Sequence, residues 1–285
     1  SEMKTKMLIC TGMFAAVAAF AVQPVETKIT HEGVWKNAEG VYTQNYPGHD
    51  YDSLLFRFPV ESDGFYKLSG EFCGTDPVLV CGLVQVPEKE FLPFTHYLFF
   101  RKGNGEFRVY QNPGPKNTLK FRNLKVERLE EADLKKNLIP DGEFESGAWK
   151  PFWQKGRWGD QEAVNVSAAS DFLQGRNSLK MGEPAKGKVN ALVSRHMPAR
   201  SNQTVVMTLW AKAATPQPLR LNLDFEQQFG KHLYQLKTVA LTPEWKEYTF
   251  EFKTPELENK RIQLHLQRES FPGDVWIDHV EFREK

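Results

Sequence analysis

No stretch of this chain keeps a helical hydrophobic period over three turns, and this feature constrains the fold most. From residue 29 to about residue 129, short runs rich in Phe, Tyr, Val and Leu alternate with clusters of turn-forming residues. Residues 61–64 and 102–105, for example, contain Gly, Asn, Asp or Ser, which tolerate turn dihedrals. Strands about ten residues apart with such turns predict an antiparallel β-sandwich.

The second half of the chain repeats the pattern of the first half. The strands expected in the first half are residues 54–58, 65–72, 78–86, 97–100, 107–110 and 119–126. Three pairs of segments correspond with nearly equal spacing: 53–58 with 191–195, 64–72 with 204–212, and 119–127 with 274–281. We therefore predict an internal duplication, with two related sandwiches in tandem and the first shortened at its start.

Length and charge agree with two ordinary globular domains. A chain of 285 residues can bury two cores. Lys and Arg number 37 against 36 Asp and Glu, so the charge gives no reason to expect nucleic acid or an anionic membrane as partner. The 21 Phe and 7 Trp residues must fill the cores or lie on the surface as stacking platforms.

The first residues have the pattern of a secretory signal. Lys4 and Lys6 precede an uncharged apolar run over residues 7–20, and small residues end it. We expect residues 1–21 to form a signal peptide cleaved after Ala21, or alternatively a retained hydrophobic anchor, although membrane spans need about 20 apolar residues. The protein is then secreted, periplasmic or at the cell surface.

The expected domains follow from these segments. The first sandwich should cover residues 28–130 and the second residues 137–285, joined by a short charged linker. Cys73 and Cys81 flank a turn-like stretch between strand-like runs, so they could form a disulfide across a hairpin or remain two buried free thiols. Metal ligation by them is not expected, because no His or further Cys lies at ligand spacing.

Three segments of the second half resemble a known family. Residues 137–147 read N-L-I-P-D-G-E-F-E-S-G, residues 175–179 read G-R-N-S-L, and residues 275–282 read V-W-I-D-H-V-E-F. Together they resemble the jelly-roll carbohydrate-binding modules attached to xylanases and cellulases. The resemblance covers residues 137–285 and implies a jelly-roll, galactose-binding-like sandwich. The expected fold class is therefore all-β, with two tandem antiparallel β-sandwiches.

Sugar recognition needs planar aromatic faces with hydrogen-bonding side chains around them. Trp149, Trp153 and Trp158 cluster in one loop and are the best-placed platforms, although the resemblance also implies that one of the first two could cap the core. Four residues, Phe225, Phe229, His232 and Tyr234, surround a turn that could border a cleft.

Two alternating strands supply the polar part of the expected site. Residues 219–226 should bury Leu and Phe and display Arg220, Asn222, Asp224 and Glu226. Residues 262–268 should display Gln263, His265, Gln267 and Arg268. If these strands share a concave face, amides, charges and an imidazole line it. The candidate glycan-binding residues are Trp149, Trp153, Trp158, Phe229, Tyr234, Gln263, His265 and Gln267.

The resemblance also implies a structural calcium ion near the opening segment and the last strand. Its carboxylate ligands would be Glu143 or Glu145 together with Asp278, with backbone carbonyls completing an oxygen shell. The alternative is that Asp278 accepts hydrogen bonds from backbone groups at the sheet edge.

The sequence gives little indication of catalysis. It contains no closely spaced E-x-D-x-x-E array, G-x-S-x-G, H-E-x-x-H or Gly-rich phosphate loop. We expect a non-catalytic protein that binds a polysaccharide or other glycan. The competing hypothesis is a structural protein of a cell-surface or envelope assembly, with protein partners. A polysaccharide lyase or hydrolase with dispersed catalytic residues is the lesser alternative.

Overall fold

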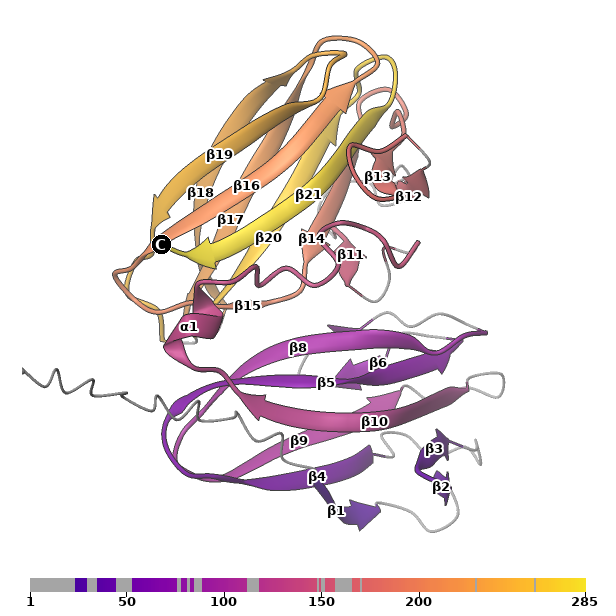
Figure 1. Cartoon of the computed structure of the whole chain (residues 1–285), viewed down its shortest axis with the longest axis vertical. Coiled ribbons are helices and arrows are strands. Elements are labelled where there is room, and N and C mark those ends of the chain that lie inside the picture. Colours follow the sequence, from indigo (N-terminus) through magenta and orange to yellow (C-terminus); the bar gives the residue numbers. More distant parts are fainter. Residues whose placement is uncertain are drawn as a thin grey trace, which may run out of the picture.

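The computed structural model describes residues 24–29, 35–44, 53–75, 78–80, 83–84, 89–111, 118–147, 149, 152–156, 166–169, 171–228, 230–258 and 260–285. These residues form two β-sandwiches, with one end of the second lying over the β8 side of the first and one short helix between them (Figure 1). The predicted all-β class with two tandem antiparallel sandwiches is confirmed. Residues 1–21, the expected signal segment, lie outside the described residues.

The described residues of the first sandwich form ten strands. They are β1 (Val25–Ile29), β2 (Trp35–Ala38), β3 (Val41–Gln44), β4 (Ser53–Val60), β5 (Gly64–Gly74), β6 (Val78–Val80), β7 (Leu83–Val84), β8 (Leu92–Phe100), β9 (Gly103–Gln111) and β10 (Leu119–Arg128). One sheet has the order β1-β4-β9-β6-β7 and the other β2-β3-β10-β5-β8.

The second sandwich contains the remaining strands. They are β11 (Trp153–Lys155), β12 (Val166–Ala169), β13 (Ser178–Met181), β14 (Val189–Ser194), β15 (Met197–Pro198), β16 (Thr204–Ala213), β17 (Gln217–Gln228), β18 (Lys231–Leu241), β19 (Lys246–Lys253), β20 (Arg261–Glu269) and β21 (Val275–Glu284). Its sheets have the orders β11-β14-β20-β17-β18, with β15 beside β20, and β12-β13-β21-β16-β19.

The two sandwiches share one topology. When β15 is set aside, the strands of the second sandwich take the same sheet positions, in the same chain order, as β1 to β10. The repeated pattern expected from the sequence is therefore present in the structure. The first sandwich is not shortened at its start as expected, because β1, β2 and β3 precede residue 53. β1 also begins at Val25, before the expected boundary at residue 28.

Each sandwich encloses its own core, and alternation along the strands determines which residues fill it. In β20, Ile262, Leu264 and Leu266 are fully buried, and in β17 the fully buried residues include Leu221 and Leu223. Burying one such side chain contributes roughly 1.5–3 kcal/mol. The opposite faces of β17 and β20 are thereby left for polar groups.

The opening motif of the second half is bonded to the last strand. The Asn137 side chain donates to the Val280 carbonyl at 3.0 Å and accepts from the Ile139 and Phe282 N–H groups, each at 3.0 Å. The Val280 N–H donates to the Gly142 carbonyl at 2.9 Å. The motif therefore joins the chain entering the sandwich to the strand that ends it.

The G-R-N-S-L segment has a related role. The Glu145 carboxylate accepts hydrogen bonds from the N–H groups of Arg176 and Asn177, at 2.7 and 3.0 Å. Gly175 has φ +70°, and a Cβ there would lie 2.3 Å from Glu145 Oε1. Glycine is favoured at this position by the left-handed φ, and a Cβ would also force the end of the Glu145 side chain to move from its two hydrogen bonds.

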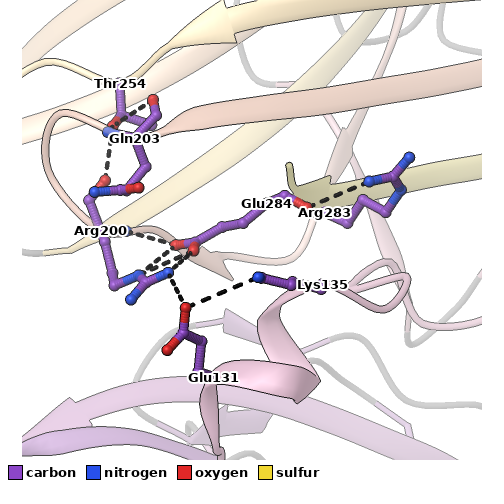
Figure 2. Close-up of polar contacts among 7 residues, drawn as sticks. All are labelled: Glu131, Lys135, Arg200, Gln203, Thr254, Arg283 and Glu284. Carbon is purple, nitrogen blue, oxygen red and sulfur yellow. Dashed lines mark hydrogen bonds and ion pairs between the residues drawn. The ribbon is translucent and has the colours of Figure 1, made fainter.

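The linker contains one turn of helix, α1 (Glu131–Leu134), where the sequence suggested only a charged segment. A capping box between Glu130 and Asp133 stabilises this turn. Arg200 holds the linker to the second sandwich, because its guanidinium forms ion pairs with Glu284 and, at 3.7 Å, with Glu131 (Figure 2).

The sandwiches also touch directly. β15 contacts β8, and Tyr97 of the first sandwich packs against the core of the second. Burial raises the pKa of Tyr97 to about 12, and the charge of Asp133 acts in the same direction. Across the junction, the His96 and His196 rings lie 6.3 Å apart.

Cys73 is a buried free thiol, whereas Cys81 lies outside the described residues. Among the helical residues that are described, none forms a segment with the length and apolar character needed to cross a bilayer.

Gly142→Ala is expected to destabilise the second sandwich. A Cβ at this position would lie 2.1 Å from the Val280 carbonyl oxygen, and that carbonyl belongs to a central strand that cannot move easily. We expect the free energy of unfolding to fall by about 3 kcal/mol, measured by urea denaturation.

The matched control is Gly187→Ala. Gly187 has φ +75° with no atom within 4 Å of a built Cβ, so it should show only the left-handed backbone cost of about 1 kcal/mol. Equal losses in both variants would contradict the close-approach explanation for Gly142.

Candidate functional site

An open groove of about 570 Å³ lies on the sheet β11-β14-β20-β17-β18, on the face opposite the core. All five strands contribute to it. The lining residues are Gln154, Lys155, Val193, Asn222, Asp224, His232, Tyr234, Gln263, His265 and Gln267.

The strand register places these side chains in rows across the sheet. Val193 pairs with Gln154 on one side and with His265 on the other, and His265 pairs in turn with Asn222. In the neighbouring row, Asp224 pairs with Gln263 and with Tyr234. Residues distant in sequence therefore meet in one groove because each lies on the outward face of its strand.

A carboxylate with two imidazoles forms the polar centre of the groove. Asp224 Oδ1 lies 2.7 Å from His232 Nδ1, and Asp224 Oδ2 lies 3.6 Å from His265 Nε2. Burial raises the pKa of Asp224, although the hydrogen bond from His232 opposes this effect. Burial, together with the charge of His232, lowers the pKa of His265 to about 4, so this imidazole is neutral near pH 7.

Tyr234 and Leu236 form an exposed strip on the edge strand β18, and of these two residues Tyr234 lines the groove. The Tyr234 side chain is 55% exposed, and its ring stacks on the His232 ring with centroids 6.0 Å apart and planes 10° apart. Leu236 follows two residues later on β18 and is 57% exposed. This edge strand therefore presents an accessible ring and an aliphatic side chain, which suit the C–H faces of a sugar.

Amide side chains provide both hydrogen-bond donors and acceptors around this strip. Gln263 Nε2 donates to the Ser194 carbonyl at 3.0 Å, which fixes the orientation of that amide. Arg195 lies buried behind the groove and donates through Nη1 to Gln154 Oε1 at 3.3 Å. Burial lowers the pKa of Arg195 to about 9, so it remains a charged donor at neutral pH.

The structure brings together part of the predicted glycan-binding set. Tyr234, Gln263, His265 and Gln267 all line the groove. Asn222 and Asp224 were expected only on an outward strand face, and His232 only beside a turn that could border a cleft. Phe225, expected beside the same turn, is fully buried in the core. Gln154, Lys155 and Val193 were not among the candidates. The alternation of apolar and polar residues in β17 indicated that Asn222 and Asp224 face outward. β11 has only three residues and is too short to show such a period.

The prediction that Trp153 is a glycan-binding platform is wrong. It is fully buried and stacks on Phe144 at 6.1 Å, because alternation in β11 turns Gln154 to the groove and Trp153 to the core. Trp149 is partly buried and packs against the same core, outside the lining of the groove. Trp158 and Phe229 lie outside the described residues.

The prediction that Arg268 lies on the outward face of its strand is also wrong. It is fully buried, and its guanidinium donates to the carbonyls of Met181, Phe271 and Gly273. Three backbone acceptors at the end of the strand account for this burial of a cation.

The three carboxylates expected to hold calcium are occupied by protein donors. Glu145 accepts from two backbone N–H groups, as described above, and Glu143 pairs with His279 Nδ1 at 2.5 Å. Asp278 accepts from the N–H groups of Leu173 and His279 at 2.9 and 2.7 Å. Within the described ranges, no three His, Cys, Asp or Glu side chains are arranged to hold a metal ion. The calcium site stays a prediction, and Asp278 makes the hydrogen bonds to backbone N–H groups that the alternative describes.

Residues 136–272 match the family model described as a carbohydrate binding domain. The match lies on the second half of the chain, so the predicted resemblance to carbohydrate-binding modules is confirmed. No curated protein sequence matches the chain.

Several solved structures are similar at low identity. The enzymatically active domain of tailspike protein 4 from bacteriophage CBA120 matches with a TM-score of 0.46 and 16% identity, over 52% of this chain and 21% of the tailspike chain. The tandem CBM22-1–CBM22-2 domain of Paenibacillus barcinonensis Xyn10C matches with a TM-score of 0.41 and 13% identity, over 95% of this chain and 99% of its own. TmCBM61, solved with β-1,4-galactotriose, matches with a TM-score of 0.40 and 19% identity, over 53% of this chain and 100% of its own.

His265→Gln is expected to make the fold less sensitive to acid. The pKa of His265 is about 4 in the folded protein against an ordinary value of 6.5, so between these values the unfolded chain binds a proton that the folded chain excludes. Wild-type stability should therefore fall relative to the variant as the pH drops through this window, by on the order of 3 kcal/mol in total. Urea denaturation at a series of pH values measures the difference.

His279→Gln serves as a control of opposite sign. Burial alone would lower the pKa of His279, but the hydrogen bond and charge of Glu143 raise it overall. Its contribution to stability should be complete below pH 6.5 and disappear as the pH rises through the folded pKa. A difference between wild type and His265→Gln that does not vary with pH would contradict a neutral His265.

Proposed function

We propose that the protein is a secreted or surface-exposed, non-catalytic glycan-binding protein whose second sandwich holds a polysaccharide segment in the groove. The observation that carries this proposal is the convergence of five strands on one open groove with an exposed ring, amides, imidazoles and a carboxylate. The family match over residues 136–272 supports it.

The groove suits an uncharged polysaccharide better than a strongly anionic one. Among the described residues that line it, there is one lysine, Lys155, and one carboxylate, Asp224, and their charges are opposite. His265 is neutral, and the amides of Gln154 and Gln263 carry no charge. Hydrogen bonding and stacking on Tyr234, rather than long-range attraction, would then supply the affinity.

We propose that the second sandwich supplies the main binding surface, because residues of that sandwich line the groove, and that the first sandwich acts chiefly as a spacer.

Export is proposed from the signal-like pattern of residues 1–21. Secretion and processing assays of the precursor would test it.

Tyr234→Ala and Asp224→Asn are expected to weaken binding to a soluble polysaccharide by about tenfold or more, which is about 1.4 kcal/mol or more. The first variant removes the exposed ring, and the second removes the charge that orients two imidazoles. Affinity electrophoresis against xylan, mixed-linkage β-glucan and galactan measures the effect.

Phe172→Ala is the matched control, because Phe172 is 42% exposed and lies outside the lining of the groove. It should bind as wild type does. No retardation of the wild-type protein by any of the polysaccharides would refute the proposal, and equal losses in all three variants would place the binding surface elsewhere.

One observation favours a second candidate, an enzyme that cleaves polysaccharide. Asp224 holds His232 through Nδ1 and leaves Nε2 directed away from the carboxylate, as in sites where an imidazole acts as general base. Hydrolysis by paired carboxylates is not supported, since the neighbouring Glu226 is bound to Arg261 Nε at 2.5 Å. A histidine-based reaction would be the alternative chemistry.

We expect the wild-type protein to release no product from the polysaccharides that it binds. Prolonged incubation, followed by reducing-end and ultraviolet assays for saturated and unsaturated products, tests this expectation. Product that appears with wild type and disappears with His232→Ala would establish the enzyme in place of the non-catalytic function.

A further inference from the structure

A second hollow, of about 270 Å³, lies at the junction of the two sandwiches. Tyr97, Leu98 and Phe99 from β8 line one side, and Glu258, Lys260 and Arg261 line the other. Its volume is below the roughly 300–1,000 Å³ usual for an independent ligand pocket. A hollow of this size suits an extension of a larger site.

This hollow is next to the groove on the same face of the sheet. Arg261 lines the junction hollow, and Gln263, two residues later on β20, lines the groove. Two residues of one strand face are separated by roughly 7 Å. Arg261 is bound to Glu226, which lies two residues beyond Asp224 on β17, so one ion-paired row separates the two hollows.

The chemistry of the junction hollow matches that of the groove. Lys260 Nζ lies 5.5 Å from the centroid of the Phe99 ring, so a cationic donor and an aromatic side chain meet there. Glu258 is an exposed acceptor, and Tyr97 supplies a phenol. An apolar ring with donors and acceptors around it is the combination that sugar residues require.

We propose that a saccharide chain held in the groove continues along β20 into the junction hollow, where the first sandwich contacts its next residue through Phe99. This inference rests on the proposed glycan-binding function. It gives the first sandwich a direct share in recognition through β8, which contributes Tyr97, Leu98 and Phe99 to the junction hollow.

The experiment is titration calorimetry with xylo-oligosaccharides and cello-oligosaccharides from disaccharide to octasaccharide. The full chain is used at pH 7.5. Burial and the surrounding cations lower the pKa of His196 well below its ordinary value, so this junction imidazole is uncharged at that pH. Phe99→Leu keeps an apolar side chain but removes the ring face, and Lys260→Gln removes the charge.

Both junction variants should bind the shortest oligosaccharides as wild type does, and bind the longest about tenfold more weakly. Tyr234→Ala should weaken binding at every length. Lys246→Gln, an exposed lysine on β19 of the other sheet, is the matched control and should change nothing. X-ray scattering of each variant should give the wild-type radius of gyration, which shows that the two sandwiches remain docked.

The outcomes separate the two proposals. Wild-type binding that gains nothing with length, or junction variants that match wild type at every length, would overturn the junction subsite and leave the groove intact. Loss of short-chain binding in Phe99→Leu and Lys260→Gln would also overturn it, because the residues would then act on the groove itself. Failure of wild type to bind any member of either series would refute the proposed function and this inference with it.

Discussion

The hydrogen bonds between Asn137 and β21 are the constraint on which the second sandwich depends. One side chain satisfies a carbonyl and two N–H groups at the place where the chain enters the fold and where it ends. The entering segment then places Phe144 against Trp153, and Trp153 anchors β11 against β14. Because β11 is fixed in this way, Gln154 can form the far wall of the groove.

The groove lies on the long strands of the second sandwich. β17 and β18 contain 12 and 11 residues. This pair extends the sheet sideways and carries Asp224 and Tyr234 across from Gln263. Because both sandwiches have the same strand order, the groove is determined by the side chains on the outward strand faces and not by the shared topology.

Hydrophobic periodicity predicted which residues of β17 and β20 are buried and which face outward, because Leu and Ile alternate with polar residues along most of both strands. It failed for Trp153, since a strand of three residues shows no period and a tryptophan suits a core as well as a sugar platform. It failed for Arg268 because three carbonyls brought by tertiary contacts make burial of that cation possible. The meeting of His232 with Asp224 depends on a register that no local pattern contains.

Folding of the groove costs free energy because two carboxylates become buried, and the pairs that compensate them make the groove rigid. Asp224 and Glu226 lie on the same face of β17, both 6% exposed, so two carboxylates are partly removed from water side by side. Each is compensated from a different neighbour, His232 on β18 and Arg261 on β20. Loss of either partner would leave a buried charge uncompensated, so the pairs hold three strands in one register. A wall held in this way loses little further freedom when a ligand binds, and binding energy is then available for discrimination among sugars.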